Sequence, residues 1–195
     1  TRNVPHRGHE YIQLKALEDT GADGLFISPV LGNKKPGDFL SEPIVKSYQT
    51  MLDTGLLPTD RAVLGSLMTY PRYAGPREAV FTALCRKNMG CSHFIVGRDH
   101  TGVGSFYGTE ETRRLFEQLG DIDIQPVFFE HIGYNHQARR YEPVGSAEND
   151  IKTISGTKAR SALRENRTLP DWYMRKVVQD QLRADLAAGR PVFSE

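Results

Sequence analysis

Two histidines stand three residues apart in TRNVPHRGHE, at the start of an amphipathic run. In a helix, His6 and His9 lie one turn apart and face the same way. Gly8 lets an anion approach the backbone, and the free N–H groups of a helix start carry partial positive charge. Arg2 supplies forked donors suited to phosphate, and Asn3 can donate or accept. The stretch therefore predicts a binding site for the phosphates of a nucleotide. The alternatives are a metal site and two surface histidines without a ligand.

A second polar cluster follows an apolar segment of strand length, in IVGRDHTGVG. Gly97 opens a glycine-rich loop around three consecutive ionisable residues, Arg98, Asp99 and His100. Ligands in parallel α/β sheets lie beyond the carboxyl ends of the strands, so this position favours a binding loop. The alternative is structural, with Asp99 capping a turn and pairing with Arg98 at the surface.

Two further stretches carry weaker signals. In ISGTKAR, Ser155 and Thr157 open a predicted helix and Arg160 falls one turn later, which suits phosphate but equally suits a plain N-cap. Taken alone, the N-cap is the better interpretation. Between a strand and a helix, Tyr70 and Tyr73 accompany two arginines; they could support an adenine, but ordering the loop is the preferred role.

Helical and strand patterns alternate along the chain with short connections. Such alternation predicts an α/β fold: a Rossmann-like doubly wound parallel sheet over residues 1–148, with a small, mainly helical C-terminal subdomain over 149–195. A strand upstream of residue 1 is expected, because such folds feed their first phosphate-binding loop from a central strand. Helices are expected at 7–20, 41–56, 75–90, 109–120, 155–166 and 170–189, and strands at 22–32, 61–68, 92–99 and 124–130.

The overall composition is that of an ordinary globular protein. Hydrophobic residues make up 38% and charged residues 25% of 195 residues, with a formal net charge of +1. That charge argues against a dedicated nucleic-acid binder, and no apolar run is long enough to span a membrane. Cys85 and Cys91 are expected to be reduced and partly buried, which favours a cytoplasmic protein without a disulfide framework.

Several motifs occur together in a fixed order, and they carry a family resemblance. TRNVPHRGH fills the pattern Q-T-R-N-P-x-H-x-x-H from the threonine on, and RYAGPREA, RKN-x-GC, HFIVGRDH and ISGTKAR follow it. Over nearly its whole length the chain resembles the catalytic region of the ATP sulfurylase (sulfate adenylyltransferase) family. The resemblance implies a nucleotidyltransferase that joins the adenylyl group of ATP to sulfate, giving adenosine 5′-phosphosulfate and pyrophosphate, or runs the reverse reaction.

The resemblance also implies roles for particular residues. Arg2, Asn3, His6 and His9 are the catalytic candidates: the histidines steady the ATP phosphates, Arg2 bridges sulfate and α-phosphate, and Asn3 supports the leaving phosphates. Thr101 falls near the sulfate. The nucleotide-binding candidates are Gly8, Gly97, Arg98, Asp99, His100, Val127, Ser155, Thr157 and Arg160. Mg²⁺ is expected with the ATP phosphates, a homo-oligomer is expected, and no zinc is, because EPVGSAENDIKT carries no cysteine.

Two departures from the family pattern leave other functions open. Val4 replaces a proline, with Pro5 one position later, and Thr101 replaces the usual alanine after G-R-D-H. The first alternative is therefore a nucleotidyltransferase acting on another oxyanion or a phosphorylated acceptor. The second is a non-catalytic nucleotide-binding module. His131 and His136 are expected in an exposed loop after the last predicted strand.

Overall fold

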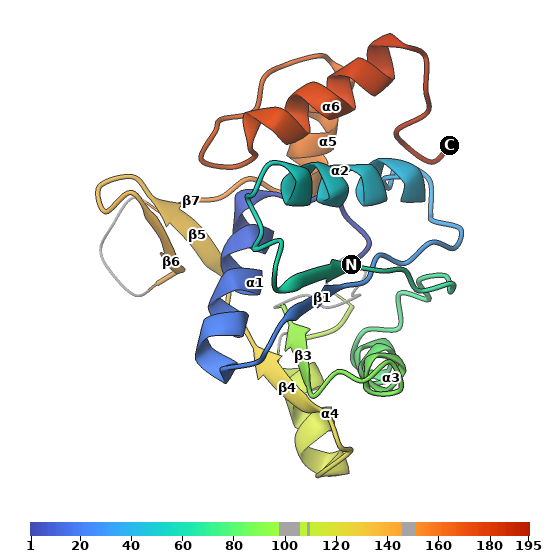
Figure 1. The fold of residues 1–195 in the computed structure, drawn as a ribbon, viewed down its shortest axis with the longest axis vertical. Helices are drawn as coiled ribbons and strands as arrows, with labels where there is room; N and C mark the ends of the chain where they lie inside the picture. Colours follow the sequence, from blue (N-terminus) through green and yellow to red (C-terminus); the bar gives the residue numbers. More distant parts are fainter. Residues whose placement is uncertain (98–105, 109, 146–150) are drawn as a thin grey trace.

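The computed structural model describes residues 1–97, 106–108, 110–145 and 151–195 (Figure 1). Helices and strands alternate from the N-terminus to β4, and a hairpin and two further helices follow. The helices are α1 (Arg7–Thr20), α2 (Ser41–Asp53), α3 (Pro76–Lys87), α4 (Glu111–Leu119), α5 (Gly156–Arg164) and α6 (Lys176–Ala187). The strands are β1 (Leu25–Ile27), β2 (Ala62–Leu64), β3 (His93–Val96), β4 (Gln125–Phe128), β5 (Ile132–Asn135), β6 (Arg140–Pro143) and β7 (Ile151–Lys152).

The strands confirm the predicted α/β class. β1 pairs with β2 and β3 pairs with β4, both parallel, with Phe26 opposite Val63 and Ile95 opposite Val127. Helices connect the strands of each pair, as parallel pairing requires. Among the residues that the structure describes, the two pairs are not hydrogen-bonded into one sheet.

An antiparallel hairpin, β5–β6, was not predicted. Tyr134 lies opposite Tyr141 in the hairpin, and the two-residue strand β7 pairs with the other edge of β5. Figure 1 shows the hairpin projecting from the body of the molecule beside α1. The tail over 149–195, expected to be mainly helical, therefore also contains the short strand β7.

Local capping explains most of the helix boundaries. Gly21 ends α1 in the left-handed region at φ 61°, and Pro76 occupies the first turn of α3. Ser41 is the first residue of α2, and its hydroxyl donates to the Leu31 carbonyl at 2.9 Å. The last helix begins at Lys176 rather than 170, because Arg175 before it has an extended ψ of 136°.

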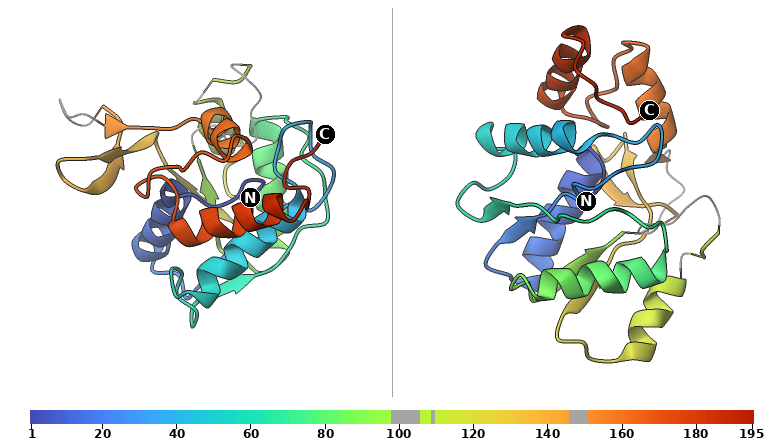
Figure 2. Two further views of the ribbon diagram at one scale, coloured as in Figure 1. Left: turned by 90° about the horizontal axis from the view of Figure 1, so that it is seen from above. Right: turned by 90° about the vertical axis from the view of Figure 1, so that its right-hand side faces the viewer.

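The larger hydrophobic core joins the two ends of the chain. It combines Ile44, Tyr48 and Met51 of α2 with Leu163 of α5 and Leu182 of α6, all at most 1% exposed. Figure 2 shows α6 lying along α2, with α5 beside them. The boundary at residues 148 and 149 stays a prediction. No described helix combines the length and apolar character needed to cross a membrane.

Candidate active site

The two histidines of the first motif form the N-terminal cap of α1. His6 Nδ1 accepts from the backbone N–H groups of Gly8 at 3.1 Å and His9 at 3.4 Å, and His9 Nδ1 accepts from the backbone N–H of His6 at 3.4 Å. This is a reciprocal capping box built from two imidazoles. Their rings stack, with centroids 3.8 Å apart, so the predicted common orientation is confirmed.

The capping box fixes where each imidazole carries its proton. An Nδ1 atom that accepts a backbone N–H is unprotonated, so the proton of the neutral ring sits on Nε2. Burial lowers the pKa of His9 to about 4, and burial followed by the charge of His9 lowers the pKa of His6 well below its ordinary value. At neutral pH both rings are therefore uncharged, and the His9 ring also makes a hydrogen bond with the Val4 backbone, which raises its pKa against the effect of burial.

The first backbone N–H groups of α1 are already used within the protein. Gly8 and His9 donate to His6 Nδ1, and Arg7 donates to the Tyr173 carbonyl at 2.7 Å. The expectation of free N–H groups at this helix start is therefore wrong. Glycine is needed at position 8 for a reason other than the predicted approach of an anion. A Cβ there would lie 2.9 Å from His6 Cε1, so glycine makes room for the capping imidazole.

Tyr173 supports the pair from the other end of the chain. Its ring stacks on His6 with centroids 4.9 Å apart, while its carbonyl caps α1. His6 thus lies between His9 and Tyr173 in a stack of three rings. Burial raises the pKa of Tyr173 to about 12, so its hydroxyl stays protonated. Sequence reasoning missed this residue, because no local pattern connects it with a helix that begins 166 residues earlier.

The arginines of the first and third motifs meet at one carboxylate. Arg2 Nη1 lies 3.8 Å from Asp38 Oδ2, and Arg160 Nη1 lies 4.0 Å from Asp38 Oδ1. The side chain of Ser155 caps α5 by accepting from the backbone N–H of Lys158 at 3.3 Å. The plain N-cap role weighed for Ser155 is confirmed, and the same turn lies near the motif of residues 1–9.

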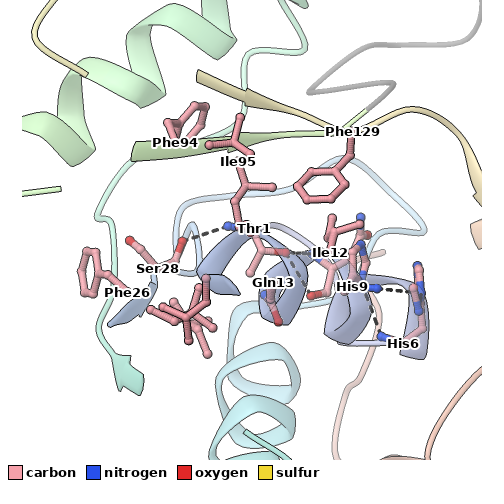
Figure 3. Close-up of a pocket in the computed structure, with 18 of the residues that line it drawn as sticks. Thr1, His6, His9, Ile12, Gln13, Phe26, Ser28, Phe94, Ile95 and Phe129 are labelled. Carbon is pink, nitrogen blue, oxygen red and sulfur yellow. Dashed lines mark hydrogen bonds between the residues drawn. The ribbon is translucent and has the colours of Figure 1, made fainter. Parts of the chain in front are cut away.

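A cavity of about 1200 Å³ brings most of the predicted residues together. Figure 3 shows His6 and His9 at one end and the apolar side chains of Phe26 and Phe94 at the other. Among the predicted site residues, those lining the cavity are Arg2, Asn3, His6, Gly8, His9, Gly97, Val127 and Ser155. Thr157 and Arg160 line a neighbouring groove of about 540 Å³ together with Asp38.

Some predicted residues lie outside the described part of the chain. Arg98, Asp99, His100 and Thr101 all fall there, although Gly97, which precedes them, lines the cavity. Val4 is 2% exposed and belongs to the larger core, so its side chain packs away from the cavity.

The remaining histidines and cysteines have simpler positions. His136 is exposed in the turn of the hairpin, as expected, whereas His131 is half-buried and lines the cavity. Cys85 and Cys91 are free and half-buried, as predicted. In the described ranges, no group of three or more histidine, cysteine or acidic side chains could hold a metal ion.

The fold and the cavity define an α/β protein whose main cavity carries imidazole and guanidinium groups, donors suited to anions. Comparison with known sequences gives the family. Residues 1–185 match the family model ATP-sulfurylase, and the chain belongs to this family.

Curated relatives agree. The chain is 44% identical to a sulfate adenylyltransferase of Pyrococcus abyssi and 43% identical to one of Synechocystis, over 94% of this chain and 48% of each relative. It therefore spans about half the length of the curated relatives it matches. Among solved structures, "Hexameric APS kinase from Thiobacillus denitrificans" has a TM-score of 0.76 over 95% of this chain and 35% of that chain. At 21% identity, this similarity concerns the fold alone.

Proposed function

We propose that the protein transfers the adenylyl group of ATP to sulfate, giving adenosine 5′-phosphosulfate and pyrophosphate, or catalyses the reverse reaction. The observation that carries the proposal is the paired imidazole donors of His6 and His9 on a cavity that Arg2 also lines, in a chain of the ATP-sulfurylase family. The whole activity is a proposal because the chain covers only 48% of its relatives.

The reaction makes limited demands on acid–base chemistry. A sulfate oxygen attacks the α-phosphorus, an S–O–P linkage forms, and the bond between the α-phosphorus and the bridging oxygen breaks as pyrophosphate leaves. Sulfate is already an anion, so no general base has to create the nucleophile. The obstacle is the approach of two anions, which positioning and charge stabilisation overcome.

The donors of the cavity match these demands. The Nε2–H groups of His6 and His9 donate hydrogen bonds to phosphate oxygens. Because both rings are neutral, their Nδ1 atoms can accept the capping backbone N–H groups at the same time. Arg2 bridges sulfate and the α-phosphate, Asn3 supports the leaving phosphates, and Arg160 faces the β,γ end. Arg2 and Arg160 each lie within 4.0 Å of Asp38, which supports a common location for the two arginines.

The nucleotide occupies the rest of the cavity in this proposal. Val127, which lines it from β4, contacts the adenine, and Gly97 and Ser155 lie along the phosphates. Gly8 contributes to nucleotide binding indirectly, because it leaves room for the His6 ring. Thr157 is proposed to contact the nucleotide from the neighbouring groove. Arg98, Asp99, His100 and Thr101 are proposed as further site residues on the family resemblance alone.

Mg²⁺ enters as part of the substrate, MgATP. The cavity offers imidazole and guanidinium donors, which suit phosphate oxygens rather than a divalent cation. The metal is therefore proposed to be held by the phosphates and water, where it neutralises the leaving pyrophosphate.

The finer features of the fold belong to the same proposal. We infer that the two parallel pairs are parts of one Rossmann-like doubly wound core of the nucleotidyltransferase type over 1–148, followed by a small subdomain over 149–195. A homo-oligomer is proposed on the family resemblance and on the hexamer named for the solved structure of similar fold. The cytoplasm is the proposed location, since free cysteines suit a reducing compartment.

Pyrophosphate release tests the choice of acceptor. The purified protein is incubated with MgATP and with sulfate, molybdate or a phosphorylated metabolite. The proposal predicts release with sulfate and with molybdate, its tetrahedral analogue. Release only with a phosphorylated acceptor would favour the other nucleotidyltransferase, and ATP binding without release would favour a binding module. Because Val4 packs into the core, it supplies no contact that would select another acceptor.

A further inference from the structure

Asp38 is a buried carboxylate in the segment between β1 and α2. The residue is 4% exposed, although nothing in its local sequence marks it as a site residue. The Tyr73 hydroxyl donates to its Oδ2 atom at 2.9 Å. Arg2 approaches the same oxygen at 3.8 Å, and Arg160 approaches the other oxygen at 4.0 Å. A single carboxylate therefore contacts three side chains from three distant parts of the chain.

Tyr73 reinforces this arrangement. The guanidinium carbon of Arg2 lies 4.9 Å from the centroid of its ring, and Lys35 Nζ lies 4.8 Å from the same centroid. Its hydroxyl also accepts the Lys35 backbone N–H at 3.3 Å. The backbone of Tyr73 is left-handed at φ 53°, which an aromatic residue seldom adopts without a compensating contact. Burial raises the pKa of Tyr73, which keeps the hydroxyl protonated as a donor to Asp38.

We propose that Asp38 is a positioning residue that holds Arg2 and Arg160 together, so that one guanidinium meets the oxyanion and the other meets the phosphates. This inference rests on the proposed function of the site. Two like charges repel, and a buried carboxylate between them offsets that repulsion. Arg2 and Arg160 are each 22% exposed at the side chain, whereas the Asp38 side chain is 6% exposed, so the arginines are more accessible to a substrate than the carboxylate is.

Asp38→Asn is the main test, because it keeps the shape of the side chain and removes its charge. We expect kcat/KM for sulfate-dependent pyrophosphate exchange to fall by about 10²-fold, the effect of misplacing a binding group by about 1 Å. The expected loss is smaller for Asp38→Glu, which restores the charge. Asp180→Asn is the matched control, since Asp180 is an exposed carboxylate that pairs with Lys176 on α6 and lines neither the cavity nor the groove. It should leave kcat and KM unchanged.

A double-mutant cycle separates positioning from a structural role. If Asp38 acts through Arg160, then Arg160→Ala costs less in the Asp38→Asn protein than in the wild type. If the fold-losses in kcat/KM of the two single variants simply multiply in the double variant, the inference is wrong. It is also wrong if the Asp38→Asn protein stays within twofold of wild-type kcat/KM, because the two arginines would then be positioned without the carboxylate. A wild-type protein without sulfate-dependent exchange would instead refute the proposed function.

Tyr73→Phe keeps the inference testable if Asp38→Asn folds poorly. It preserves the ring under Arg2 and removes only the hydroxyl that donates to Asp38. We expect a fall in kcat/KM of about tenfold, because the carboxylate remains but loses the donor that fixes its position. An unchanged kcat/KM in a folded Tyr73→Phe protein would contradict the role of Asp38.

Discussion

At the scale of single residues, the histidine pair combines two tasks that are usually separate. The Nδ1 atoms of His6 and His9 accept the backbone N–H groups at the start of α1, and both rings also line the cavity. A structural requirement and a chemical one therefore fall on the same side chains. Substitutions can separate the two, because Asn at an N-cap accepts backbone N–H groups without offering an imidazole.

His6→Asn and His6→Ala should differ in stability but not in activity. Asn retains a side-chain oxygen for the cap, so we expect His6→Ala to be less stable by about 1 kcal/mol. Both variants lose the Nε2–H donor, and we expect both to lose about 10²-fold or more in turnover. Urea denaturation and pyrophosphate release measure the two effects. An active His6→Asn protein would show that the histidine serves only as a cap.

Gly8→Ala tests the close packing behind the pair. The added Cβ would lie 2.9 Å from His6 Cε1, a distance that forces the ring to move. We expect turnover to fall by about 10-fold or more, because the shifted ring no longer aims its donor. Circular dichroism should show that α1 persists. Normal turnover would indicate that the position of the His6 ring is not critical.

At the scale of elements, α1 is held at its start by contacts from the far end of the chain. Glu10 accepts from Arg175 through both oxygens, at 2.9 Å to Nε and 2.5 Å to Nη2. Glu10 is 8% exposed and the Arg175 side chain 29% exposed, so the carboxylate is the buried partner of the pair. The Tyr173 carbonyl caps α1 from the same segment. The orientation of the histidines therefore depends on the segment that precedes α6.

Arg175→Ala should strongly destabilise this arrangement. It leaves the Glu10 carboxylate buried without its partner, which costs about 3–5 kcal/mol in comparable pairs. Asp180→Ala is the control, because it breaks the exposed pair of Lys176 with Asp180 on α6. Exposed pairs contribute about 0–1 kcal/mol. Equal changes in the free energy of unfolding for the two variants would contradict the anchoring role of Glu10 and Arg175.

The histidine cap also predicts how stability depends on pH. An unfolded histidine has a pKa near 6.5, whereas burial lowers that of folded His9 to about 4. Between these values the unfolded chain binds a proton that the folded chain does not. The free energy of unfolding therefore falls as pH drops from about 6.5 to about 4, by at most about 1.4 kcal/mol per pH unit for this histidine.

His9→Gln isolates this effect from the titration of carboxylates. Gln can complete a capping box but does not titrate. We expect the stability difference between wild type and His9→Gln to shift in favour of the variant as the pH is lowered through this window. Denaturation curves between about pH 7 and 4 provide the measurement. A constant difference across that range would mean that folded His9 titrates normally.

At the scale of the whole molecule, the two ends of the chain form one core beside the site. Leu163 is fully buried among residues of α2 and α6, in the cluster that also contains Val4. Leu163→Ala should lower the free energy of unfolding by about 2–5 kcal/mol. Leu119, 47% exposed at the end of α4, is the control and should change stability by about 0.5 kcal/mol or less on substitution by Ala. Similar losses for both would contradict this description of the core.

The sequence predicted what depends on local pattern. The common orientation of His6 and His9 and the Ser155 cap follow from helical spacing and capping chemistry, and both are confirmed. The parallel strand pairs follow from the alternation of apolar runs with helices. The hairpin was missed because its strands are four residues long, and the positions that β5 buries are Gly133 and Asn135 rather than large apolar side chains.

Other features of the site depend on contacts between remote residues. Asp38 and Tyr73 are 35 positions apart, and the Tyr173 carbonyl caps a helix at Arg7. No periodicity or motif encodes such contacts, so sequence reasoning expected free N–H groups at α1 and overlooked the carboxylate between the arginines. Tyr73 was noted only as a loop-ordering residue. The structure shows that its hydroxyl donates a hydrogen bond to Asp38, so Tyr73 also fixes the position of that carboxylate.

The central claim is that the histidine pair and the arginines hold a triphosphate next to sulfate. Incorporation of labelled pyrophosphate into ATP, measured for the purified protein with and without sulfate, tests it most directly. We predict exchange that requires sulfate and that falls by about 10²–10³-fold in His9→Ala, the effect of removing one donor to developing charge. Exchange that is absent in the wild type, independent of sulfate, or undiminished in a folded His9→Ala protein would contradict the account.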